Sequence, residues 1–171
     1  MGRIKRALVA TLSGFLAAGV LTASTTSPAR AETVTVHDPT GDTQDHLGYD
    51  ITSMRIRHKA KRISFELRQS QTPYWYEIRV DVPGPKPWSY LVTWAVYTPH
   101  KVYVQKRHAD PETFVCVRKN ADTSNHDKLL TFTLPRSCFG PPKAVKVKAI
   151  AWDDQFGWSD RTVWSEWVHV S

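Results

Sequence analysis

Apolar residues alternate with polar ones through most of the chain after residue 31, and this period of two predicts β-strands. The clearest case is the run Ile63, Phe65 and Leu67, whose intervening neighbours are all polar. No segment keeps a helical spacing for three turns. The alternation predicts about ten short strands, around residues 34–36, 54–56, 63–67, 76–82, 89–97, 101–106, 114–118, 128–134, 145–151 and 163–170.

Short strands separated by Pro, Gly, Asn and Asp predict an all-β fold, an antiparallel two-sheet β-sandwich with jelly-roll or Greek-key connections. A single closed barrel is the alternative. Residues 89–97 are apolar on both faces, which predicts a central strand or one that carries a binding face. The chain has no internal repeat and no low-complexity linker, so residues 32–171 are expected to form a single domain.

The first 31 residues are expected to be a cleaved signal peptide. Three basic side chains within the first six residues precede an apolar run over residues 7–23, and Ala29-Arg30-Ala31 supplies the small residues of a cleavage site. The apolar run is shorter than the ~20 residues that a membrane helix needs. We therefore expect a secreted protein without a membrane anchor, either extracellular or associated with the cell wall.

Removing this segment lowers the net charge from +7 to +3, because it holds four of the 23 basic residues and none of the 16 acidic ones. So small an excess of positive charge no longer indicates nucleic acid as a partner. We expect a monomer that binds an extracellular glycan or a secreted protein.

The only two cysteines, Cys116 and Cys138, are expected to form a disulfide. An exported chain matures in an oxidising compartment, where paired cysteines are favoured. A reactive or metal-bound thiol pair is the alternative, but the spacing is not that of a CxxC motif.

Asp38, Asp42, Asp45 and Asp50 follow the first predicted strand, and Gly41 permits a sharp turn among them. Calcium takes six to eight oxygen ligands, and carboxylates in such a loop can supply them. The alternative is turn chemistry, in which the aspartates bond to backbone amides of the loop. The spacing is not that of an EF-hand, so both interpretations stay open.

Aromatic residues are more numerous than one core needs: seven Trp, six Tyr and five Phe follow residue 31. An indole presents an apolar face to a sugar ring, while nearby carboxylates bind the hydroxyl groups. Covering one end of the sandwich and binding a protein are the alternatives. The candidate ligand-binding residues are Trp88, Trp152, Asp153, Asp154 and Trp158.

Positive charges also cluster in one predicted hairpin, which carries Arg55, Arg57, Lys59, Lys61 and Arg62. Such a run is usually a solvated face. The functional alternative is an anionic wall polymer, whose binding would be sensitive to salt.

Signals of catalysis are mostly absent. The chain has no GxSxG elbow, no HExxH motif and no phosphate-binding loop. Asp153 and Asp154 would serve a glycosidase only with a third acid several Å away. We therefore expect that the protein is not an enzyme.

Three segments occur together: Asp38-Pro39-Thr40-Gly41-Asp42, Asp50-Ile51 and Leu134-Pro135-Arg136-Ser137-Cys138-Phe139-Gly140. In this combination the chain resembles a family of small secreted proteins of uncertain function from high-GC Gram-positive bacteria. Its Asp-rich loop is also similar to the opening of carbohydrate-binding sandwiches and DOMON-type domains. The resemblance implies an extracellular sandwich and glycan binding, without implying an activity. The Trp-rich stretch after Ala151 departs from that pattern.

The sequence therefore predicts a secreted, non-enzymatic module that binds an extracellular polysaccharide. Two alternatives remain: a protein-interaction or inhibitor module, and a glycan hydrolase.

Overall fold

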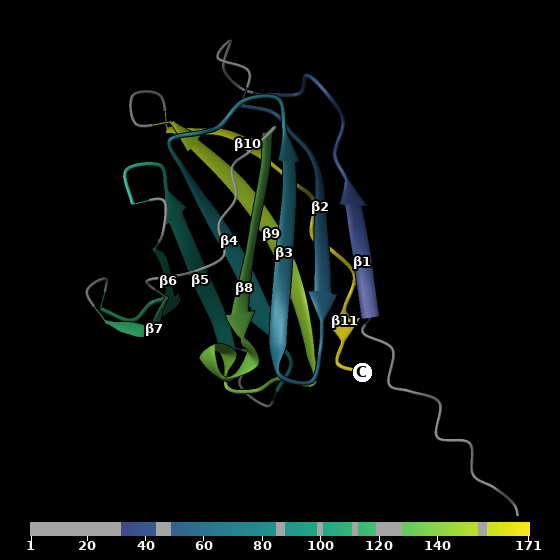
Figure 1. The fold of residues 1–171 in the computed structure, drawn as a ribbon, viewed down its shortest axis with the longest axis vertical. Coiled ribbons are helices and arrows are strands. Elements are labelled where there is room, and N and C mark those ends of the chain that lie inside the picture. The colour runs from purple at the N-terminus through teal and green to yellow at the C-terminus, as the bar shows by residue number, and fades with distance from the viewer. Residues whose placement is uncertain are drawn as a thin grey trace, which may run out of the picture.

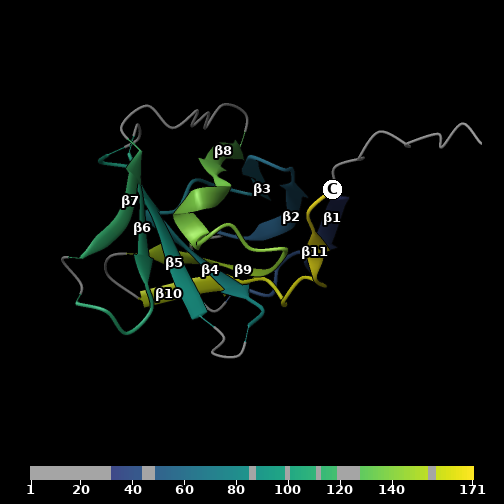
Figure 2. The same cartoon turned by 90° about the horizontal axis from the view of Figure 1, so that it is seen from below.

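A computed structural model describes residues 32–43, 49–84, 88–98, 101–110, 113–118, 128–153 and 157–171, with only the backbone of Trp88, Trp158 and Ser159. The expected signal peptide, residues 1–31, lies outside the described residues, as do Asp45 and Asp154. The described strands form two antiparallel layers (Figures 1 and 2). The predicted all-β, two-sheet sandwich is thus confirmed.

The smaller sheet has four strands in the order β1-β2-β3-β8. The larger sheet has seven, in the order β10-β9-β4-β5-β6-β7, with β11 also paired to β9. β5 lies between β4 and β6, so it is central, as its two apolar faces predicted. Figure 2 shows the larger sheet curling at its β6–β7 edge toward the layer that holds β8.

The smaller sheet comprises β1 (Glu32–His37), β2 (Ile51–His58), β3 (Arg62–Gln69) and β8 (Leu129–Pro135). The larger comprises β4 (Trp75–Val82), β5 (Trp88–Ala95), β6 (Val102–Lys106), β7 (Phe114–Arg118), β9 (Ala144–Asp153), β10 (Gly157–Arg161) and β11 (Val168–His169).

The core lies between the two sheets, because alternate side chains of each strand point inward. In β4, Tyr76, Ile78 and Val80 are buried, while the polar residues between them are half-buried on the outer face. In the smaller sheet, Phe65 and Phe132 stack with their ring centroids 5.0 Å apart. Burial of each such side chain contributes roughly 1.5–3 kcal/mol, which makes the alternating pattern the main source of stability.

A short 3-10 helix, η2 (Arg136–Phe139), closes one end of the sandwich. The Arg136 guanidinium donates hydrogen bonds to three carbonyls, those of Ala60, Pro141 and Pro142. The helix ends at Gly140, whose φ of +70° favours glycine. Cys138 in η2 bonds to Cys116 in β7, which confirms the predicted disulfide. The bond indicates an oxidising environment, and it ties the edge of the larger sheet to η2.

The C-terminal residues Gly157–Val170, here called the closing segment, follow the outer edge of β9 along most of its length. Between β10 and β11 the N–H groups of Thr162 and Ser165 still donate to the carbonyls of Ala149 and Val147, at 3.0 and 2.8 Å, but hydroxyl groups replace carbonyls as acceptors. Thr162 Oγ1 accepts the N–H of Ala149 at 3.1 Å, and Ser165 Oγ accepts the N–H of Val147 at 2.9 Å. β9 therefore keeps its hydrogen bonds where the regular pairing is interrupted.

The closing segment also bonds to the smaller sheet at three points, and both views place β11 beside β1 and β2. Asp160 Oδ2 accepts the N–H of Ile51 at 2.5 Å, and the His169 N–H donates to the Glu32 carboxylate. His58 Nδ1 lies 2.9 Å from the Val168 carbonyl, and because a carbonyl only accepts, Nδ1 carries the proton. These bonds join the two sheets along one side of the sandwich.

His58 is fully buried at the end of β2. Burial lowers the pKa of the His58 imidazole below its usual range, and the nearby Arg136 guanidinium acts in the same direction. In the unfolded chain His58 takes up its proton near pH 6.5, whereas in the folded protein it does so only at a lower pH. Its contribution to stability is therefore present above about pH 6.5 and is lost as the pH falls further.

We predict that His58→Gln removes part of the acid sensitivity of the fold. The glutamine amide can still donate to the Val168 carbonyl but does not titrate. Urea unfolding at pH 7.5, 6.5 and 5.5 should give a weaker dependence of the unfolding free energy on pH, by up to about 1.4 kcal/mol per pH unit. His37→Gln, at an exposed position of β1, should keep the wild-type dependence, and equal slopes in all three proteins would contradict the assignment.

We predict that Cys116→Ser/Cys138→Ser lowers the free energy of unfolding by about 3 kcal/mol, because the disulfide no longer restricts the unfolded chain. Urea unfolding measures the loss, and wild-type protein treated with a reductant should unfold at the same urea concentration as the variant. Alkylation without reductant should leave the mass unchanged. Two added alkyl groups would refute the bond.

Candidate functional site

Three carboxylates meet at the open end of the sandwich where β1 ends and β10 runs. The carboxylate oxygens of Asp38, Asp42 and Asp160 lie within 4.8 Å of one another. Asp38 follows β1, Asp42 lies in the turn after it, and Asp160 comes from β10 of the other sheet. Asp38 and Asp160 are buried, whereas Asp42 is exposed. We call these three residues the acidic cluster.

The backbone around the cluster is fixed by hydrogen bonds. The Asp38 N–H donates to the Thr52 carbonyl at 3.1 Å, which keeps the end of β1 beside β2. Gly41, with a φ of +86°, makes the turn, and its N–H donates to Asp50 Oδ2 at 2.9 Å. The Asp160 carboxylate accepts two N–H groups, one from Ile51 and one from Arg161. Backbone contacts therefore help to bring the carboxylates together.

Burial and mutual repulsion oppose ionisation in this cluster. Burial raises the pKa of Asp38 to about 7, and the negative charge of Asp160 adds to the shift. Asp42 and Asp50 act in the same direction, while a backbone hydrogen bond from Val163 opposes them. Burial also raises the pKa of Asp160, and its two backbone hydrogen bonds reduce this rise. A bound cation would relieve both effects.

Several buried oxygen atoms around the cluster have no hydrogen-bond partner among the described residues. They are Asp38 Oδ2, Asp50 Oδ1 and the hydroxyl of Tyr76. Tyr76 is fully buried, and burial raises the pKa of its hydroxyl well above the usual range, with the charge of Asp160 adding to the rise. Unpartnered buried oxygens are rare in native proteins. Hard oxygen donors around a negative cavity suit a divalent cation, so the cluster could hold a metal ion.

The four predicted metal ligands have different positions. Asp38 and Asp42 lie together, but the third member of their cluster is Asp160 rather than one of the predicted residues. Asp50 accepts the N–H of Gly41 through Oδ2, which is the turn chemistry that the sequence left as the alternative. Its other oxygen is the buried, unpartnered atom beside the cluster. Asp45 lies outside the described residues.

An aromatic group lies at the same end of the molecule, on the outer face of the larger sheet. Trp75 and Trp152 are paired across β4 and β9, and their rings stack with centroids 5.8 Å apart and planes inclined by 10°. The Tyr74 ring packs edge-on against the ring of Trp75, with centroids 6.2 Å apart, and its centroid lies 5.9 Å from that of Tyr97. Tyr74 and Tyr97 are 39% and 69% exposed. We call these four residues the aromatic surface.

The indole N–H of Trp152 is buried and has no partner among the described residues. The part of its half-buried side chain that reaches solvent therefore consists of ring carbons. The Tyr74 N–H donates to the Trp152 carbonyl at 3.0 Å, and the Val96 N–H donates to the Tyr74 carbonyl at 3.0 Å. These bonds fix the backbone that carries the aromatic surface.

The predicted ligand-binding residues do not all lie together. Trp152 belongs to the aromatic surface, and Trp158 is its backbone partner across β9 and β10. Trp88 pairs with Val82 at the other end of the sheet. Asp153 is only 5% exposed, because β9 continues through it and adjacent strand residues face opposite sides. Asp153 therefore does not flank the exposed indole, and Asp154 lies outside the described residues.

Sequence reasoning missed four residues of this end, namely Tyr74, Trp75, Tyr97 and Asp160. Trp75 is the first residue of β4, in which apolar and polar residues alternate, so this pattern could have predicted that the Trp75 side chain faces outward. Its pairing with Trp152 depends on the register of strands far apart in the sequence, which the pattern does not contain. Asp160 had one signal, an acidic side chain at an inward position of a short strand.

Comparison with protein-family models, with curated proteins and with solved structures found no match to this chain. The resemblance to small secreted sandwich proteins therefore stays a prediction. Among the described residues, no helix has the length and apolar character that crossing a bilayer requires.

Proposed function

We propose that this protein is a secreted, non-enzymatic module that binds extracellular polysaccharide through the aromatic surface. The observation that supports this most directly is the stacked pair Trp75 and Trp152 on the outer face of the larger sheet. Exposed indole and phenol rings offer flat apolar area to the C–H faces of sugar rings. The Tyr74 and Tyr97 hydroxyl groups add polar atoms at the rim.

We further propose that calcium binds the acidic cluster and stiffens the backbone beneath the aromatic surface. The β9–β10 hairpin carries Trp152 on one side and Asp160 on the other. A cation held by Asp160, Asp38 and Asp42 would tie this hairpin to the turn after β1. Asp50 Oδ1 and the Tyr76 hydroxyl are further oxygens for the six to eight that calcium takes.

Binding is favoured over glycan hydrolysis because two of the three carboxylates of the acidic cluster, those of Asp38 and Asp160, are buried. A carboxyl pKa near 7 is also typical of a general acid. However, Asp38 and Asp160 are 8% and 2% exposed, which leaves little of either carboxylate for a sugar to contact. Burial and the charge of Asp160 raise the pKa of Asp38, and a bound cation would offset both effects.

A protein-interaction module is the second candidate, and one observation favours it. The edge strand β7 pairs only with β6 among the described strands. Its side chains Phe114, Val115 and Val117 are 44%, 43% and 41% exposed. An exposed apolar edge of this kind can add a strand from a partner. Co-purification of a secreted protein that Val115→Lys abolishes, without retention on any glycan, would favour this second function.

We predict that calcium raises the melting temperature of the protein by roughly 8 °C when its concentration is 100 times the dissociation constant. The binding energy of the cation adds to the stability of the folded state alone. Calorimetry with CaCl2, MgCl2 and EDTA measures the shift. A melting temperature that is the same in CaCl2 and in EDTA would contradict a calcium site.

Asp42→Asn tests the ligand set, because Asp42 is exposed and its loss does not disturb the core. The variant should lose most of the calcium shift while melting in EDTA at or above the wild-type temperature, since one repulsive charge is gone. Glu166→Gln, at an exposed position away from the cluster, should respond to calcium like the wild type.

We predict that Trp152→Ala weakens retention on an insoluble glycan about tenfold or more, equivalent to ~1.4 kcal/mol of binding free energy. Depletion assays with cellulose, chitin and peptidoglycan identify the glycan and measure the loss. Tyr97→Ala removes a 69% exposed ring that contributes little to the core, so it should weaken retention without lowering the melting temperature.

Trp167→Ala is the matched control, because Trp167 is 40% exposed but lies just before β11, outside the aromatic surface. It should bind like the wild type. Equal losses in Trp152→Ala and Trp167→Ala, or no retention of the wild type on any of the three glycans, would count against the proposal.

A further inference from the structure

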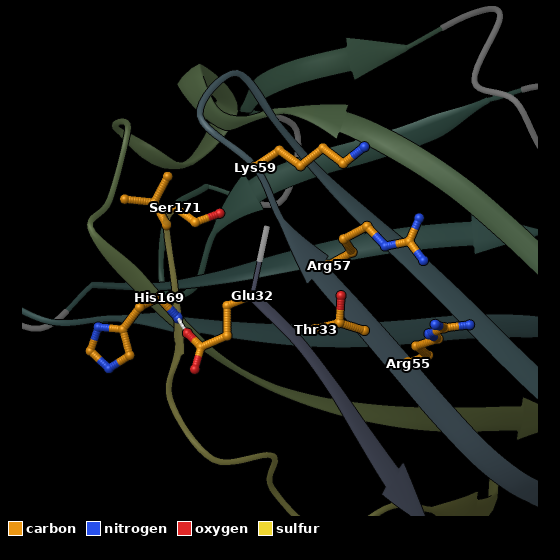
Figure 3. Close-up of a pocket in the computed structure, with 8 residues that line it drawn as sticks. Glu32, Thr33, Arg55, Arg57, Lys59, His169 and Ser171 are labelled. Carbon is orange, nitrogen blue, oxygen red and sulfur yellow. Dashed lines mark hydrogen bonds between the residues drawn. The ribbon is translucent and has the colours of Figure 1, made fainter. Parts of the chain in front are cut away.

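The outer face of the smaller sheet carries a row of positive charges along β2. Arg55 and Arg57 occupy alternate, outward positions of this strand, and Lys59 follows it in the turn to β3. Successive outward residues of a strand are about 7 Å apart, so Arg55 and Arg57 start at that spacing, and Lys59 continues the row beyond the strand. In Figure 3 the side chains of Arg55, Arg57 and Lys59 project in the same direction from this row.

The row continues around the end of the sheet. Lys61 and Arg62 extend it through the β2–β3 turn, and Arg118 joins it from β7 of the other sheet. We call these six residues the cationic face. Two contacts described above hold it in place. Arg136 bonds to the Ala60 carbonyl inside the turn, and the Cys116–Cys138 disulfide fixes β7 two residues before Arg118.

Positive charges outnumber negative ones on this face. Among the described residues, no carboxylate lies within ion-pair distance of any member of the cationic face. Two acidic side chains lie close to it: Glu32 lines the same surface as Arg55 and Arg57, and Glu66 is the neighbour of Arg55 across β2 and β3. Glu66 pairs with Arg68 at 3.5 Å, and Glu32 accepts the N–H of His169 (Figure 3). Six cations against two carboxylates leave an excess of positive charge, which raises the local concentration of anions.

The surface between these side chains is hollowed. A shallow groove of about 950 Å³ runs beside Arg55, Arg57 and Lys59 and is bordered by the C-terminal residues. A second hollow, of about 600 Å³, lies among Lys59, Lys61, Arg62 and Arg118. A smaller one connects to the first through Arg55 and Arg57 and is lined by the hydroxyl groups of Ser64, Thr131 and Thr133. Ser64 Oγ and Thr133 Oγ1 are hydrogen-bonded to each other at 2.9 Å, so one of these two hydroxyls, together with that of Thr131, can donate to an oxyanion.

We propose that the cationic face binds a linear anionic glycan polymer, whose phosphate or carboxylate groups contact Arg55, Arg57 and Lys59. A row of cations can form several ion pairs with a polymer that carries an anionic group in each repeat, whereas one small anion would contact only one or two members of the row. None of the outward side chains of β2 and β3 is aromatic, so the face lacks the rings on which unpaired bases stack. The disulfide indicates an oxidising environment, where such polymers occur outside cells. This proposal does not rest on the aromatic surface.

The test compares two double substitutions that remove the same charge from opposite sides of the sandwich. Arg55→Gln/Arg57→Gln removes two cations from the cationic face. Lys146→Gln/Lys148→Gln removes two from the outer face of the larger sheet, on β9. Binding to immobilised poly(glycerol phosphate) and polygalacturonate is measured by interferometry at 50 to 200 mM NaCl, with a DNA duplex as a third probe.

The arginine variant should bind about tenfold more weakly than the wild type at 50 mM NaCl, and the lysine variant should change less than about twofold. Wild-type affinity should fall about tenfold or more between 50 and 200 mM NaCl, as expected when several ion pairs form. Binding of one polymer or of both supports the proposal, and the preference identifies the anion as phosphate or carboxylate.

Four outcomes would overturn it: no binding of either polymer at 50 mM NaCl, equal losses in the two variants, an affinity that does not depend on salt, or DNA bound as tightly as the polymers. Melting temperatures within about 2 °C of the wild type, expected for surface substitutions, establish that each variant is folded.

Discussion

The hydrogen bonds between the closing segment and the smaller sheet are the constraint on which the rest of the structure depends. Each layer of the sandwich satisfies its own backbone groups within its ladder, so without further bonds only packing and the Cys116–Cys138 disulfide would hold the layers together. The Asp160 carboxylate and the Val168 carbonyl add directional contacts across that gap, to the Ile51 amide and to the His58 ring. Directional bonds fix the relative position of the layers, which apolar packing specifies less strictly.

The same constraint determines where a cation could bind. An aspartate that bridges two sheets must be buried, and a buried carboxylate is costly unless it is hydrogen-bonded or neutralised. Asp160 is hydrogen-bonded, but Asp38 brings a second carboxylate to the same place, where burial and the charge of Asp160 raise the pKa of Asp38. The turn after β1 thereby meets the β9–β10 hairpin at a point of unfavourable charge. A cation there would replace repulsion among the three carboxylates with a cross-link between the two layers.

Much of the fold could be predicted from the sequence, because a half-buried strand must alternate apolar and polar residues. Contacts that depend on the pairing register of strands far apart in the sequence could not be predicted. Trp75 meets Trp152 only because β4 and β9 pair at that offset, and Asp160 meets Ile51 across 109 residues of sequence. The predicted strand over residues 163–170 was wrong over most of its length, and only Val168–His169 is extended and paired. Thr162 and Ser165 bond to β9 through their side chains, which interrupts the ladder while the apolar pattern continues.

The Pro-Arg-Ser-Cys segment has a structural explanation that bears on the family resemblance. Arg136 binds three carbonyls, Cys138 forms the disulfide, and Gly140 ends η2, so each distinctive residue stabilises the closed end of the sandwich. None of them belongs to the aromatic surface or to the acidic cluster, which lie at the opposite, open end. A protein that shared only this segment would share the way in which the sandwich is closed. Shared ligand chemistry would instead require the Asp38 turn together with an acidic residue at the position of Asp160, because those groups come from opposite sheets and meet only in the folded chain.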